Sequence, residues 1–173
     1  SSIVLIAAVR RIRQPGCKFD EMLVLESPQG ASKSSALAAL CPRTEWFTDT
    51  LPLASDSKQT IEQTSGCWII EAAELSGMRK SEVEQVKAFL SRRSDRARLA
   101  FGRLPAHRPR QFIVIGTTNS DAYLRDTTGN RRFWPVKTLE FNADRIAEVR
   151  DQLWAEASVR EAAGGPHCTR LDP

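Results

Sequence analysis

Three short apolar runs constrain the fold of this 173-residue chain more than any other feature of its sequence. They occupy residues 22–25, 67–70 and 112–115, and polar residues follow each of them. Runs of this length are typical of buried strands. Segments with apolar residues at helical spacing lie between them, and strands that alternate with helices predict a parallel sheet flanked by helices. We therefore expect one α/β domain over residues 1–163 and an irregular tail over residues 164–173.

The expected helices cover residues 2–13, 34–40, 57–64, 81–91 and 144–163, with Ser81 as the cap of the fourth. Further strands are expected at residues 46–48 and 132–136. No apolar run approaches the roughly 20 residues that a membrane span needs. The apolar residues 3–9 also lack the charge order and cleavage site of a signal peptide, so we expect a cytoplasmic protein with no membrane partner. The four cysteines form no Cys-x-x-Cys pair, which argues against a zinc site.

The loop after the first apolar run resembles a P-loop, G-x-x-x-x-G-K-[ST]. In that pattern the glycines let backbone N–H groups surround phosphates, the lysine neutralises their charge, and the hydroxyl binds Mg²⁺. Both signature glycines are serines here, so an ordinary strand-loop-helix turn with a surface lysine explains the loop equally well. If Ser32 needs a positive φ, its side chain costs on the order of 1 kcal/mol. The predicted nucleotide-binding residues are Ser27, Pro28, Gln29, Gly30, Ala31, Ser32, Lys33, Ser34 and Ser35.

Polar residues at the ends of the other two apolar runs are candidate catalytic groups. Glu71 would lie beside the P-loop in a parallel sheet, where it can hold Mg²⁺ together with Ser34. Glu74 either polarises the attacking water or is a carboxylate in the first turn of a helix. Asn119 either contacts the γ-phosphate and orients water or caps a turn.

Basic residues suggest two further sites. Arg131 and Arg132 follow a turn and can act as arginine fingers given in trans, which implies a ring or a partner, or they belong to a basic turn. Residues 79–110 hold ten Lys/Arg and three acids, a net charge of +7 against +4 for the chain. Such a segment fits either a polyanion partner or a solvated helix face.

Together these segments resemble the virulence-associated E family, which is related to superfamily 3 helicases and AAA+ ATPases. The resemblance covers roughly residues 1–160, but the family has glycine where Ser27 and Ser32 stand. The last matching block, residues 126–136, is the most specific. The matching segments are residues 15–20, 27–34, 68–71 with Glu74-Leu75, 86–91, Asp95-Arg96 with Arg98, 116–119 and 126–136.

The resemblance implies a P-loop ATPase with an AAA+/superfamily 3 helicase-like fold, from a replication protein of phages or mobile elements. Its cofactors would be ATP and Mg²⁺. Its partners would be single-stranded DNA, further copies in a ring, and a primase-type domain or protein. Glu71 would serve the metal, Asn119 would sense the γ-phosphate, and Arg131 or Arg132 would be the trans finger. Superfamily 3 proteins place residues that contact DNA or nucleotide in the region between Glu71 and Asn119. In this region we expect contacts with nucleic acid from Lys87, Arg96, Arg98 and Arg103.

Two other functions stay open at this point. The serines at positions 27 and 32 favour a nucleotide- or DNA-binding module that does not hydrolyse ATP. A kinase or another phosphoryl transferase is also possible on a P-loop scaffold, because fold does not determine function. The sensor-like Asn119 and the paired arginines favour a helicase-type ATPase over a kinase.

Overall fold

The chain folds around a five-stranded sheet with the strand order β2-β3-β6-β1-β7. The computed structural model describes residues 2–53, 56–73, 75, 78–98, 104–119 and 130–164. All four pairings in this sheet are parallel, which confirms the predicted fold class. The strands are β1 (Met22–Glu26), β2 (Phe47–Thr48), β3 (Ile69–Ala72), β6 (Ile113–Thr118) and β7 (Phe133–Lys137).

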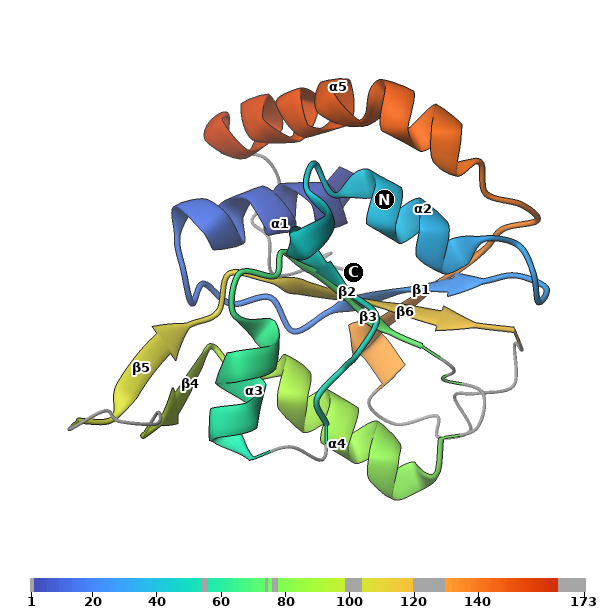
Figure 1. Cartoon of the computed structure of the whole chain (residues 1–173). Coiled ribbons are helices and arrows are strands. Elements are labelled where there is room, and N and C mark those ends of the chain that lie inside the picture. Colours follow the sequence, from blue (N-terminus) through green and yellow to red (C-terminus); the bar gives the residue numbers. More distant parts are fainter. Residues whose placement is uncertain are drawn as a thin grey trace.

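Helices cover both faces of the sheet (Figure 1). On one face lie α1 (Ser2–Arg13), α2 (Lys33–Leu40) and α5 (Ala143–Ala162), and on the other lie α3 (Ser57–Thr64) and α4 (Lys80–Leu90). Successive strand residues point to opposite faces, so Ile69 packs in the cluster with α1 while Ile70 packs in the cluster with α4. Burying each such side chain contributes about 1.5–3 kcal/mol.

Most element boundaries agree with the sequence prediction to within two residues, and the differences have local causes. Helix α4 begins at Lys80, and its N-cap is Arg79 rather than Ser81, because the Glu82 carboxylate accepts a hydrogen bond from the Arg79 N–H. Strand β3 begins at Ile69 rather than residue 67, because the N–H of Cys67 donates to the Thr64 carbonyl at the end of α3. Residue 46 ends a 3-10 helix, η1 (Thr44–Trp46), instead of starting a strand.

A two-stranded antiparallel hairpin, β4 (Ser94–Ala97) with β5 (Ala106–Pro109), was not predicted. Figure 1 shows it projecting from the end of the molecule opposite to the arrowheads of β1 and β6. A buried ion pair anchors its base: Arg110 donates to both oxygens of Asp95 at 2.7 and 2.8 Å. The Arg110 guanidinium also lies 4.1 Å from the ring centroid of Phe89 and donates to its carbonyl at 2.6 Å. The hairpin therefore leaves the core at a defined angle.

The connection between α1 and β1 also holds this hairpin base. Gly16 donates its N–H to the Arg110 carbonyl at 2.9 Å and accepts from Arg93 Nε at 2.7 Å. Its φ of +78° and the position of a Cβ, 3.2 Å from the Arg93 oxygen, explain why glycine stands there. Within the described ranges, no helix is both long and apolar enough to cross a membrane.

Candidate functional site

The loop between β1 and α2 contains two residues with positive φ, Gly30 and Ser32. Ser32 adopts φ 57° and ψ 33°, in the left-handed region, directly before Lys33. Its side chain is exposed and makes no capping hydrogen bond. Gly30 also has a positive φ, of +83°. The chain thus makes its sharp turn before α2 with a serine at a position that favours glycine.

The ammonium of Lys33 lies inside the curve of this loop. It donates to the Ser27 carbonyl at 3.1 Å, to Ser27 Oγ at 3.0 Å and to the Pro28 carbonyl at 3.1 Å. It also reaches the end of β6, where Asn119 Oδ1 accepts at 2.8 Å. Burial lowers the pKa of Lys33, and the negative charge of Glu71 opposes that shift. The lysine therefore joins the loop to the residue that follows β6.

Glu71 is the buried charge beside this loop. The residue is 1% exposed, and its Oε1 accepts hydrogen bonds from Ser34 Oγ at 2.9 Å and Thr117 Oγ1 at 2.6 Å. The other carboxylate oxygen, Oε2, is buried without a hydrogen-bond partner among the described residues. The strand register explains the grouping. Glu71 pairs with Ile115, two positions before Thr117 on β6, so both side chains point to the sheet face that α2 covers.

This arrangement fits Mg²⁺ and a phosphate group. Magnesium prefers oxygen ligands and is held in proteins by one or two carboxylates plus phosphates and water. A bound ion or its water would explain a buried carboxylate oxygen that has no hydrogen-bond partner. Glu71 and the exposed Ser34 hydroxyl supply protein oxygens, and the N-terminus of α2 favours an anion. In the part of the chain that the structure describes, no group of three or more His, Cys, Asp or Glu could hold a metal by itself.

The remaining predicted nucleotide-binding residues lie around this centre. Pro28, Gln29 and Gly30 are exposed, and Ala31 is partly buried. Ser35 is exposed in the first turn of α2. Glu74 lies outside the described residues, so its role remains a prediction.

Sequence reasoning missed Thr117. The signal that points to it is strand alternation, because residues 115, 117 and 119 share one side of an extended chain. That signal becomes useful only when the position of Glu71 on the neighbouring strand is known.

Arg131 and Arg132 lie far from the P-loop of their own chain. They form the 3-10 helix η3 (Asn130–Arg132), directly before β7. Strand β7 runs parallel to β1, with Phe133 beside Met22 and Lys137 beside Glu26. The P-loop follows Glu26, at the carboxyl end of β1, whereas the arginines lie at the amino end of the neighbouring strand β7. The two groups are therefore separated by the length of β7, roughly 13 Å.

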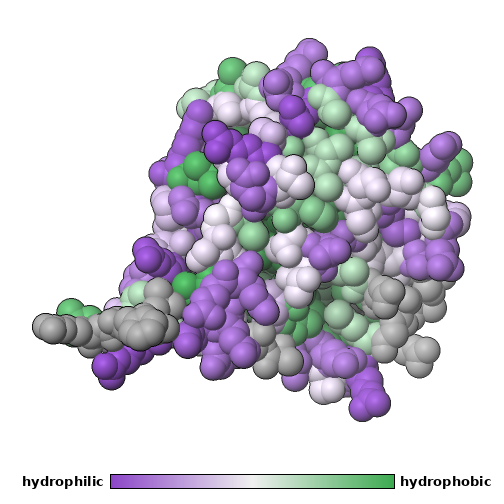
Figure 2. All heavy atoms as spheres, viewed as in Figure 1, coloured by the Kyte–Doolittle hydropathy of each residue, from purple (hydrophilic) through white to green (hydrophobic). Residues whose placement is uncertain are grey.

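The predicted nucleic-acid residues do not form one exposed group. Lys87 is 5% exposed and donates to Glu84 Oε1 at 2.8 Å, so its burial makes it a poor phosphate contact. Arg96 on β4 and Arg98 just after it are exposed. Arg103 lies outside the described ranges. Figure 2 shows hydrophilic residues beside the base of the projecting hairpin, with hydrophobic residues between them.

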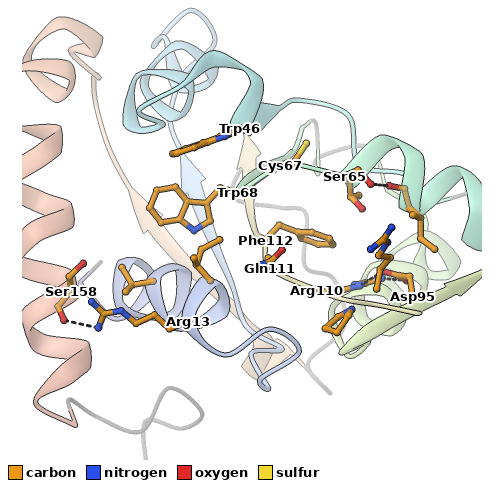
Figure 3. Close-up of a pocket in the computed structure, with 17 residues that line it drawn as sticks. Arg13, Trp46, Ser65, Cys67, Trp68, Asp95, Arg110, Gln111, Phe112 and Ser158 are labelled. Carbon is orange, nitrogen blue, oxygen red and sulfur yellow. Dashed lines mark hydrogen bonds and ion pairs between the residues drawn. The ribbon is translucent and has the colours of Figure 1, made fainter. Parts of the chain in front are cut away.

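A separate cavity of about 670 Å³ lies at the edge where β3 and β6 begin. Figure 3 shows Trp68 and Phe112 along its wall, with Arg110 and Asp95 on one side and Arg13 on the other. Trp68 and Phe112 directly precede the two strands, whereas Glu71 and Thr117 lie towards their ends. The cavity is therefore distinct from the P-loop site.

A parallel sheet in which one inner strand, β1, leads through a lysine-serine loop into a helix, with a buried glutamate beside that loop, defines a P-loop NTPase fold. Comparison with known families supports this class. The family model for the virulence-associated protein E-like domain matches residues 1–168. The chain belongs to this family.

Comparison with one solved structure supports the same fold. The apo A form of the NrS-1 C-terminal region is similar to this chain with a TM-score of 0.62 and 12% identity over 91% of the chain. A second structure of that region, residues 305–718, matches with a TM-score of 0.44 and 11% identity over 90% of the chain. The chain spans 40% and 38% of those two chains, respectively. No curated protein matches the sequence.

Proposed function

We propose that this domain binds ATP and Mg²⁺ and hydrolyses ATP to move along single-stranded DNA, as the core of a phage- or mobile-element replication protein. One observation carries the proposal: Ser34 donates to Glu71 Oε1, while the buried Oε2 has no partner among the described residues. A serine at a helix N-terminus that holds a buried carboxylate is the arrangement that a metal-bound phosphate chain needs.

Each of the site residues would have its own role in the proposed ATP hydrolysis. The N–H groups at the start of α2 would bind the β- and γ-phosphates, and Lys33 would exchange its present oxygen partners for phosphate oxygens. Ser34 and Glu71 would hold Mg²⁺, which neutralises charge that develops on the transferred phosphoryl group. Asn119 accepts a hydrogen bond from Lys33, which supports a role in which it would contact the γ-phosphate and orient the attacking water.

Arg131 and Arg132 suit a neighbouring protomer rather than their own active site. They lie at the amino end of the parallel strands, whereas the P-loop of the same chain lies at the carboxyl end. An arginine finger given in trans stabilises the charge of the transition state and needs an interface between copies. We therefore propose a ring in which each protomer completes the site of the next one.

The β4–β5 hairpin is the proposed DNA contact. Arg96 and Arg98 are exposed, and Arg108 on β5 adds a third exposed arginine. The buried pair Asp95–Arg110 gives the projecting strands a fixed base, which a contact that transmits movement requires. Lys87 is excluded from the proposed contact surface by its burial. A primase-type domain or protein remains the proposed partner of this core.

The decisive measurement is the rate of Mg²⁺-dependent ATP hydrolysis with and without single-stranded DNA. We expect the wild type to turn over faster with DNA, and Lys33→Ala to lose turnover because it removes the phosphate-neutralising charge. The double variant Arg96→Gln/Arg98→Gln should keep its basal rate and lose the stimulation. Its DNA binding should also depend less steeply on salt, because fewer counterions are released. A well-folded wild type without turnover, and with none restored by Ser32→Gly, would refute the proposal.

The alternative is a module that binds nucleotide or DNA without hydrolysing ATP. The left-handed serine at position 32 favours it, because a side chain there would crowd a phosphate bound by the loop. Tight ATP binding without turnover in both the wild type and Ser32→Gly would favour this alternative. Turnover restored by Ser32→Gly would instead assign the defect to the loop.

A further inference from the structure

Two hydroxyl groups converge on one oxygen of Glu71. Thr117 Oγ1 donates to Glu71 Oε1 at 2.6 Å, and Ser34 Oγ donates to the same atom at 2.9 Å. Oε2, the second oxygen of the carboxylate, is buried and has no partner among the described residues. The carboxylate is thus held by hydrogen bonds at one oxygen, whereas the other oxygen is buried without such a partner.

The two donors differ in what else they can do. Ser34 is exposed at the start of α2 and can turn its oxygen towards a bound cation while its hydrogen still points to Glu71. Thr117 is 4% exposed in the middle layer of the fold, so solvent does not compete for its hydroxyl. The short bond from Thr117 is of the charge-assisted kind, which is stronger than a bond between neutral groups.

The orientation of the Glu71 carboxylate needs such a donor. The terminal torsion of a glutamate side chain has a broad, roughly two-fold distribution and is not held by intrinsic preference. A bond to Oε1 from a buried strand residue restricts that rotation and turns Oε2 away from the donor. The free oxygen is then the one available to a cation or to its bound water.

We propose that Thr117 is a positioning residue for the metal site, which presents Glu71 Oε2 to Mg²⁺ or to a water on it. This inference rests on the proposed function, since it assigns a task to the same site. Groups that orient ligands in this way typically change metal affinity or activity by about 10–100-fold when they are removed.

The test compares Thr117→Val, which removes the hydroxyl at similar volume, with Thr117→Ser, which keeps it. Thr60→Val is the matched control, because Thr60 is also buried and its hydroxyl donates to the carbonyl of Asp56, the N-cap of α3, away from the site. Calorimetry measures the affinity for ADP at a series of Mg²⁺ concentrations and without Mg²⁺. Thermal melting of each variant reports its fold, and steady-state kinetics give kcat and KM for ATP.

We expect Thr117→Val to weaken the Mg²⁺ dependence of ADP binding and to lower kcat, each by about 10–100-fold. ADP affinity without Mg²⁺ should stay within about two-fold of the wild type, whereas KM for ATP should rise at low Mg²⁺ concentration, and Thr117→Ser should recover most of the loss. Thr60→Val should leave all four quantities unchanged. If Thr117→Val does not fold, Thr117→Ala provides the same comparison.

An unchanged Mg²⁺ dependence in Thr117→Val would overturn the inference. Equal losses with and without Mg²⁺ would also overturn it, because they would mean that Thr117 only supports the loop. A wild type that binds ADP with Mg²⁺ but does not hydrolyse ATP would refute the proposed hydrolysis alone, and the calorimetric comparison would still decide the role of Thr117.

Discussion

Ser32→Gly should make the protein more stable. Ser32 has φ 57° and ψ 33°, a region that costs a residue with a Cβ about 1–2 kcal/mol and costs glycine nothing comparable. The exposed serine side chain makes no capping bond, so removing it loses no such contact. Glycine also gives the unfolded chain more conformational freedom, which reduces the gain in stability by about 0.4–1 kcal/mol. The net gain is about 0.5–1 kcal/mol, which raises Tm by about 1–4 °C in a chain of this size.

Urea unfolding and thermal melting without nucleotide measure this gain, with an unchanged m-value as the sign of an unchanged fold. Ser32→Ala is the control, because it keeps the Cβ and should stay within about 0.5 kcal/mol of the wild type. Gly30→Ala is the reverse test. With φ at +83° and no atom within 4 Å of an added Cβ, it should lose about 1 kcal/mol through the backbone alone. A Ser32→Gly variant no more stable than Ser32→Ala would refute the reasoning about φ.

Two further predictions concern the contact between α1 and α5 and the proposed ring. Hydrogen bonds from Arg13 at 2.6 Å and Arg10 at 3.1 Å lower the pKa of Glu161, so its contribution to stability is present above the unfolded-state pKa near 4.5 and is lost as the pH falls below it. Glu161→Gln should therefore lower the free energy of unfolding by about 1–2 kcal/mol at pH 7. Urea unfolding at decreasing pH should show this difference between wild type and variant becoming smaller. An equally large difference at pH 3.5 would contradict this account. For the ring, we expect Lys33→Ala and the double variant Arg131→Ala/Arg132→Ala to be inactive alone. An equal mixture should recover up to about a quarter of wild-type ATPase activity, because each variant supplies what the other lacks. No recovery in a mixture whose light scattering shows rings would argue against fingers in trans.

The elements of the core could be predicted from the sequence because local patterns encode them. Helices α1 and α3 have the predicted boundaries, and the three apolar runs became the inner strands β1, β3 and β6. The β4–β5 hairpin could not be predicted in this way. Its strands are short and partly charged, without the apolar alternation of a half-buried strand. A buried ion pair between residues 15 positions apart anchors its base, and no periodicity reveals such a contact.

The candidate site was predictable only as a set of separate residues. The motif pointed to Lys33 and Ser34, and the strand ends pointed to Glu71 and Asn119. Their distances follow from the sheet order, in which β6 lies between β1 and β3. The same order placed Thr117 beside Glu71, although no local pattern marked that threonine.

The sequence by itself therefore determined which segments form the parallel sheet and its flanking helices, the α/β class, and the loop that carries the lysine and the serine. These properties depend on residues close together in the chain, whose apolar spacing and turn chemistry act locally. Only the tertiary structure decided which oxygen of Glu71 accepts hydrogen bonds and which has no partner among the described residues. It also placed Arg131 and Arg132 at the amino end of the strands, away from the P-loop of their own chain at the carboxyl end. The physical reason is register: a shift of one residue between β3 and β6 would turn Thr117 to the other face of the sheet, and the core packing on both faces rules out that shift.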